Sequence, residues 1–213
     1  MCRGSLESAP KTGPDFRRDR TRFSEDRSLG GTPRATTKGM TGNKQSATQL
    51  SRELRNGSSK ELRHRRAIVA LSLTASASMG LIALYQMGII KHLPEPPLPR
   101  MNADQVDASA EAYEMLRTPD AVLGLGSYAA TMGLAAMGGS DRSHDMPLIP
   151  LALALKIGFD AVNAARLSVD QWTKHRAFCF WCLLASAATF AMVPLAMREA
   201  SVALRAISTD RRP

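Results

Sequence analysis

The stretch AIVALSLTASASMGLIALYQMGII, residues 67–90, decides the fold class, because none of its 24 residues carries a charge. As a helix rising about 1.5 Å per residue it would reach about 36 Å, more than the roughly 30 Å hydrocarbon core of a bilayer. Residues 121–139 and 177–197 are also uncharged, while residues 146–165 are apolar but interrupted by Lys156, Asp160 and Asn163. No segment alternates strictly, so a barrel is not expected. The sequence predicts an all-α bundle of four transmembrane helices.

Residues 1–66 differ sharply in composition from the rest of the chain. They hold 16 of the 28 Lys and Arg residues but only 7 of the 19 Asp and Glu residues, so they carry the whole net charge of +9. Without an apolar period, this segment is expected to be a disordered basic tail. A nucleic-acid arm is disfavoured because Phe16 and Phe23 are its only aromatic residues. The basic cluster 63–66 abuts the first apolar segment, which favours a cytoplasmic tail near anionic lipid. The sequence leaves open whether Met1 or Met40 starts the protein.

The charged flanks predict the orientation. Arginines precede the first span, and residues 198–213 form a short basic tail after the last. Positive flanks stay in the cytoplasm, so both termini are expected there, with loops 91–120 and 166–176 outside. Arg166, Lys174 and Arg176 oppose this orientation but are outnumbered.

The first outer loop has a helical pattern after its proline-rich start. Val106, Ala110, Tyr113 and Leu116 recur at helical spacing, and acidic residues that include Asp107 fall between them. The loop is therefore expected to contain an amphipathic helix. Its apolar face is expected to rest on the outer end of the bundle, either as a lid or as simple interfacial packing.

Cys179 and Cys182 open the fourth span on the side predicted to face outward, where oxidation is permitted. Their i, i+3 spacing lets a helix bring both sulfurs to one face. A helix N-terminus and the basic residues 174–176 favour a thiolate there. A structural disulfide is the weaker alternative, because the loop it closes is too short to stabilise much. A zinc site is not expected, since only His175 is near as a further ligand.

Two segments resemble the vitamin K epoxide reductase family. The run from Ala103 through Ser109 and Tyr113 to Tyr128 is similar to that family's lid and second helix, and Cys179-Phe-Trp-Cys182 to its active-site motif. The resemblance covers residues 67–197 and implies electron exchange between protein thiols and a membrane quinone, in a bacterial inner membrane. It implies that Cys182 reacts with the quinone, that Cys179 exchanges with loop cysteines, and that Ser109 lies beside the site.

The chain departs from the family pattern at Ala103, where the family usually has cysteine. Residues 91–120 contain no cysteine at all. The expected alternatives are an external thioredoxin-fold thiol partner that meets Cys179 directly, or a non-catalytic membrane scaffold that retains the fold. Lys156 and Asp160 are spaced to pair within the third span, either as functional groups or as a neutralised contact.

Overall fold

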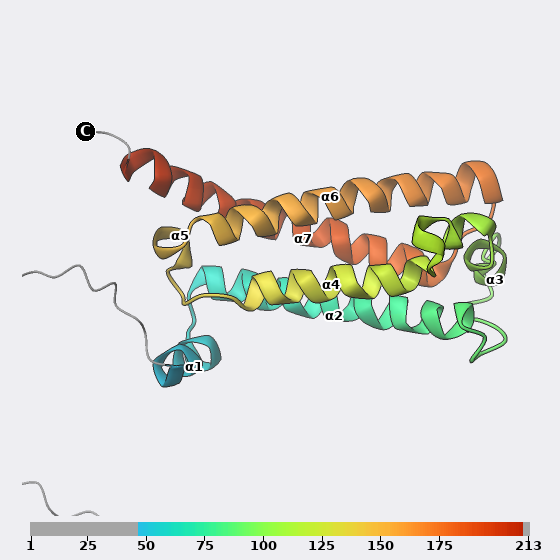
Figure 1. The fold of residues 1–213 in the computed structure, drawn as a ribbon, viewed down its shortest axis with the longest axis horizontal. Coiled ribbons are helices and arrows are strands. Elements are labelled where there is room, and N and C mark those ends of the chain that lie inside the picture. The colour runs from blue at the N-terminus through green and yellow to red at the C-terminus, as the bar shows by residue number, and fades with distance from the viewer. Residues whose placement is uncertain (1–46, 211–213) are drawn as a thin grey trace, which may run out of the picture. The chain divides into compact units, whose positions relative to one another are not determined.

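The computed structural model describes residues 47–210, and its architecture is an assembly of helices (Figure 1). The four long helices are α2, α4, α6 and α7, and short helical segments join them. In chain order the elements are α1 Ala47–Asn56, α2 Lys60–Gln86, α3 Ala103–Asp107, η1 Ala110–Tyr113, η2 Met115–Arg117, α4 Asp120–Ala136, α5 Arg142–Asp145, α6 Leu148–Asp170, η3 Gln171–His175 and α7 Phe180–Asp210.

The predicted all-α fold is confirmed over the described residues, because most of each of the four apolar segments lies in one long helix. Three helical stretches are long and apolar enough to cross a membrane: Lys60–Gln86, Leu148–His175 and Phe180–Thr209. The fourth, α4, has 17 residues and so spans about 25 Å, a little less than a typical hydrocarbon core.

Small residues let the long helices approach closely. Helix α2 packs against both α4 and α7, and α6 packs against α7. At Gly124 of α4, an added Cβ would come within 2.9 Å of the sulfur of Met79 in α2, so glycine sets this helix contact. The buried core between the helices is formed mainly by small and aliphatic side chains: Ile68, Ala75, Tyr128, Ala135, Leu153, Ile157, Ala185, Ala188, Met192 and Ala196.

Large apolar side chains also cover the outside of the bundle. Exposed positions include Leu73 of α2, Leu155 and Phe159 of α6, and Phe190 of α7. A large exposed apolar surface marks a site of contact with lipid or with another protein. Long helices suit lipid because their backbone hydrogen bonds are all made within the helix.

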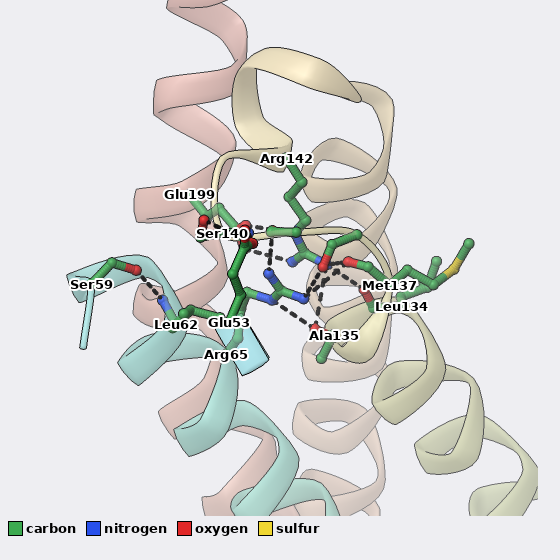
Figure 2. Close-up of polar contacts among 12 residues, drawn as sticks. Glu53, Ser59, Leu62, Arg65, Leu134, Ala135, Met137, Ser140, Arg142 and Glu199 are labelled. Carbon is green, nitrogen blue, oxygen red and sulfur yellow. Dashed lines mark hydrogen bonds and ion pairs between the residues drawn. The ribbon is translucent and has the colours of Figure 1, made fainter. Parts of the chain in front are cut away.

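Two buried arginines close the end of the bundle near α1 and α5 (Figure 2). The guanidinium of Arg65 donates to the carbonyl oxygens of Ala135, Met137, Gly138 and Gly139 at distances of 2.8 to 3.1 Å. Arg142 donates to the carbonyl oxygens of Leu134 and Met137 from the other side. The last carbonyl groups of a helix have no partner within it, and these two cations supply one for α4.

Three helical stretches lie outside the predicted spans, because hydropathy marks only the apolar part of a helix. Residues 47–66, assigned to a disordered tail, contain α1 and the start of α2, whose first turn is capped by Ser59 through a 3.2 Å bond from Leu62 N–H. Residues 166–175, expected to be a loop, continue α6 through η3. Residues 198–210, expected to be a tail, continue α7. The rest of the predicted N-terminal tail, residues 1–46, lies outside the described residues.

Candidate active site

The two cysteines lie at the head of α7, at the end of the bundle that carries α3 (Figure 1). Cys179 occupies the N-cap position: its carbonyl oxygen accepts from Leu183 N–H at 3.0 Å, and its Sγ accepts from Cys182 N–H at 3.2 Å. The sulfur therefore takes the place that a Ser or Asp side chain usually fills at a helix start. Both thiols are free, with Cys179 fully buried and Cys182 partly exposed.

A π-helical turn brings a third polar side chain to the pair. At η3 the chain leaves the α-helical register, and it ends at Arg176 in the left-handed region with φ 52°. This turn buries Gln171, whose Oε1 accepts from the backbone N–H of Cys179 at 3.1 Å. A π turn of this kind is often found at functional sites. Sequence periodicity gave no signal for Gln171, because a π turn shifts the face on which a residue lies.

A backbone pairing fixes the first outer loop beside the cysteines. Phe178 N–H donates to the Arg100 carbonyl at 2.8 Å, and Asn102 N–H donates to the Phe178 carbonyl at 3.0 Å. The next residue, Ala103, is fully buried in one apolar cluster with Cys179. Its N–H donates to both carboxylate oxygens of Glu95, each at 3.0 Å. The structure thus buries Ala103 in the same cluster as Cys179.

Asp107, at the end of α3, is buried against the second cysteine. Only 2% of its surface is exposed, and the thiol of Cys182 donates to its Oδ1 at 3.3 Å. Burial raises the pKa of Asp107 to about 6; bonds from the two thiols oppose this shift, and the nearby acids Asp120 and Glu95 add to it. The expectation that Asp107 lies on the polar side of its helix, away from the bundle, was wrong.

The helical spacing failed here because the predicted helix is broken. Helix α3 ends at Asp107, and Ser109 has extended backbone angles (φ −66°, ψ 155°) before η1 begins. Residues spaced at the helical period from Val106 to Leu116 therefore do not lie on one face. Val106 is buried as expected, but Ala110 and Leu116 are exposed.

The basic residues 174–176, which were expected to favour a thiolate, do not contact the cysteine thiols. Lys174 is exposed and pairs with Asp170 at 3.2 Å, and no basic side chain among the described residues bonds to either thiol. The charged side chain in contact with Cys182 is the carboxyl group of Asp107.

A cavity of about 210 Å³ opens beside Cys182, between the outer-loop segments and the long helices. Cys182, Asp107 and Ser109 line it together, so the structure brings the sequence-predicted Ser109 close to the second cysteine. Tyr128 of α4 and Asp160 of α6 line the same cavity deeper in the bundle. Cys179 does not line it. The two thiols thus face different surroundings: Cys182 the cavity, Cys179 the buried outer loop.

Asp160 belongs to a polar group inside the bundle. Lys156 donates to Asp160 one turn along α6, and to the Thr131 hydroxyl and the Ser127 carbonyl of α4. The predicted pairing of Lys156 with Asp160 is therefore present. The Lys156 amine also lies 5.8 Å from the centre of the Tyr128 ring, within the range of a cation–π contact.

A family comparison covers this part of the chain. The sequence model of the vitamin K epoxide reductase family matches residues 66–197, which include all four long helices in whole or in part and both cysteines. The chain belongs to the vitamin K epoxide reductase family. No match was found among curated proteins or among solved structures.

Members of the vitamin K epoxide reductase family are typically thiol–quinone oxidoreductases and generally use a quinone. The chain is accordingly an integral membrane protein with several candidate spans. Its Cys-x-x-Cys pair lies within the matched region.

The same three side chains also form a set of close metal-ligand atoms. The sulfurs of Cys179 and Cys182 and a carboxylate oxygen of Asp107 all lie within 4.8 Å of one another. A structural zinc site uses four protein ligands, whereas this set offers three. His175, the only nearby metal ligand that the sequence suggested, is not part of the set.

Proposed function

We propose that this protein is a membrane thiol:quinone oxidoreductase in which Cys179 and Cys182 cycle between dithiol and disulfide. The observation that carries the proposal is the different surroundings of the two sulfurs. Cys182 lines a cavity between the outer-loop segments and the long helices, which we assign to the quinone ring, while Cys179 is fully buried beside the outer loop. Two thiols at separate depths, close enough to form a disulfide, suit a relay of an electron pair.

In this proposal Cys182 reacts with the quinone, and Ser109 contacts the quinone from the outer loop. Ser109 is half-buried in the cavity wall and its hydroxyl makes no helix-capping bond, so it is free to donate to a quinone oxygen. Cys179 exchanges with an external thioredoxin-fold thiol partner, because residues 91–120 contain no cysteine. Since Cys179 is fully buried, the outer loop must move before a partner can reach it.

The proposed orientation has both termini in the cytoplasm of a bacterial cell and the cysteine pair at the outer face of the inner membrane. The Arg65 and Arg142 cluster and the cysteine pair lie at opposite ends of the bundle, which supports this arrangement (Figure 1, Figure 2). Positively charged residues at one membrane flank favour its retention in the cytoplasm.

A second candidate function is a non-catalytic membrane scaffold that keeps the family fold. It is favoured by the complete burial of Cys179 and by the alanine at position 103. One measurement separates the two functions. Purified protein reduced with dithiothreitol and freed of excess reductant is mixed with a soluble quinone analogue. The enzyme converts one quinone to quinol as its cysteine pair becomes a disulfide, whereas a scaffold leaves quinone and thiols unchanged.

A further inference from the structure

Asp107 is a buried acid that the cysteine relay, as proposed above, does not use. Its Oδ1 accepts from the Cys182 thiol, but its Oδ2 has no hydrogen-bond partner although it is buried. A buried carboxylate oxygen without a hydrogen-bond partner costs stability, because it has lost its bonds to water. No Lys or Arg among the described residues bonds to Asp107 to offset that cost. A group kept in such an unfavourable place and in contact with a reacting sulfur is a candidate for chemistry.

The charges around Asp107 favour uptake of a proton. The titratable groups that face it are Tyr85 of α2, Glu95 of the outer loop, Asp120 of α4, and the thiols of Cys179 and Cys182 in α7. The negative charges of Asp120 and Glu95 repel a negative charge on Asp107 and so raise its pKa. The cavity that Asp107 lines also carries Glu111, Asp160, Asp170, Lys174 and His175. Of these, Lys174 and Asp170 are already paired with each other.

We infer that Asp107 is a catalytic residue of the proposed oxidoreductase: it takes the proton of the Cys182 thiol and returns it to an oxygen of the bound quinone. The inference rests on the proposed function for the quinone step but not for the proton exchange between Asp107 and Cys182. A carboxylate within hydrogen-bond reach of the proton it removes meets the first requirement for a general base.

The reaction balances with the groups at the site. The Cys182 proton moves to Asp107, and the thiolate adds to a quinone ring carbon, forming a C–S bond and placing an electron pair on the quinone oxygens. Cys179 then attacks the Cys182 sulfur, so that the disulfide forms while the C–S bond breaks and its electron pair leaves with the ring. One proton from Asp107 and one from the Cys179 thiol complete the quinol. Two thiols are oxidised and one quinone is reduced.

Thiol reactivity measured without quinone tests the proton exchange directly. When a thiol and a carboxylate share one proton, the small thiolate fraction stays nearly constant from the pKa of the carboxyl group beside the thiol up to its higher pKa beside the thiolate. Without the carboxylate, the thiolate fraction rises about tenfold per pH unit until the thiol itself titrates. The pKa of Asp107, about 6, sets the lower end of the constant range.

The experiment follows alkylation of Cys182 by iodoacetamide from pH 6.5 to 8, with the modified residue assigned by fragment mass spectrometry. We expect a rate that changes less than about threefold in the wild type and rises about tenfold per pH unit in Asp107→Asn. Asp104→Asn is the matched control: it removes a charge from the same short helix, where the carboxylate bonds His92 and the Leu93 N–H rather than a thiol. It should keep the wild-type profile.

The quinone assay then tests the second half of the inference. Asp107→Asn should lower the rate of quinone reduction at pH 7 by about 100-fold or more, the usual contribution of a positioned base, with little change in KM. Identical alkylation profiles for wild type and Asp107→Asn would overturn the proton exchange even if the enzyme reduces quinone. If the wild type reduces no quinone, the proposed function fails, while the alkylation profiles still decide the proton exchange. A thermal midpoint of Asp107→Asn that is no lower than that of the wild type excludes misfolding as the cause.

Discussion

Arg142 and Glu199 form a fully buried, two-pronged ion pair: Arg142 Nε lies 2.6 Å from Glu199 Oε1, and Arg142 Nη2 lies 2.7 Å from Oε2 (Figure 2). The pair joins the short helix α5 to the distal half of α7. Both side chains are almost entirely removed from solvent, at 0% and 2% exposure. Arg142 also caps α4, so a single guanidinium connects three helices.

Removing the acid of this pair should destabilise the bundle strongly. In Glu199→Gln the Arg142 cation keeps its carbonyl bonds but loses its counter-charge, and breaking a buried pair typically costs about 3–5 kcal/mol. Thermal unfolding in detergent should show a clearly lower midpoint. Asp141→Asn is the control, because Asp141 and His144 are exposed and 4.0 Å apart, so their pair contributes at most about 1 kcal/mol. An equal shift in the two variants would mean that the buried pair adds nothing specific.

The proposed roles of the two cysteines predict different products from the two single variants. Cys182→Ser should abolish quinone reduction, because no sulfur remains at the cavity. Cys179→Ser should accumulate a Cys182–quinone adduct, since no second thiol is present to displace the ring. Intact-mass measurement after quinone addition detects the adduct. Cys2→Ser, which removes the third cysteine, should behave as wild type. If all three variants oxidise like the wild type, the scaffold function is the one that remains.

The four membrane helices and the cysteine pair were predictable from the sequence because each depends on residues close together in the chain. Uncharged runs of about 20 residues mark membrane helices whatever their partners. The Cys-x-x-Cys spacing places two sulfurs at one helix end. The pairing of Lys156 with Asp160 was predictable for the same reason, since one turn of helix separates them.

The contacts of Asp107 and Gln171 depend on where helices α3 and α6 end. The spacing of residues in the sequence did not reveal these ends. Asp107 reaches Cys182 because α3 ends immediately after it, and Gln171 reaches Cys179 because α6 ends in a π turn. Arg65 belonged to the basic cluster 63–66 that was expected to lie near anionic lipid, and no pattern singled out Arg142. Instead, both guanidinium groups are buried because they donate to carbonyl groups at the end of α4.

The Lys156 and Asp160 pair should behave as a unit within the membrane. Asp160→Leu alone leaves an unpaired cation inside the bundle, and we expect a loss of stability of about 3–5 kcal/mol. Adding Lys156→Met should restore most of that loss, because an apolar pair of similar volume replaces the ion pair. Thermal midpoints of the two single variants and the double variant give the coupling between the residues. A double variant no more stable than the worse single variant would contradict pairing as the reason for the loss.

The proposed topology predicts where reporters are active. A fluorescent protein fused after Pro213 should fold and fluoresce, as it does in the cytoplasm, while alkaline phosphatase fused there should be inactive. A cysteine at Leu98, which is 53% exposed in the first outer loop, should react with a membrane-impermeant maleimide added to intact cells. Active phosphatase at the C-terminus would place the cysteine pair on the cytoplasmic side and overturn the assignment of an external thiol partner.

Ala103 lies at a position where a cysteine would be close to Cys179. Residues 102 and 178 are joined by a backbone hydrogen bond, and the residues that follow them, Ala103 and Cys179, are both fully buried in one cluster. A disulfide requires the two Cα atoms to lie within about 7 Å of each other, which neighbouring paired segments allow.

Ala103→Cys should therefore form a crosslink to Cys179 once Cys182→Ser has left Cys179 without its partner. Mild oxidation followed by non-reducing peptide mapping identifies the 103–179 pair. Ala108→Cys is the matched control, because Ala108 follows α3 directly but is exposed and is not part of the buried cluster. Equal crosslinking at 103 and 108 would show that the loop moves freely and makes no ordered cover over Cys179. Absence of a crosslink at 103, with the variant folded, would remove the structural basis for assigning thiol exchange to Cys179.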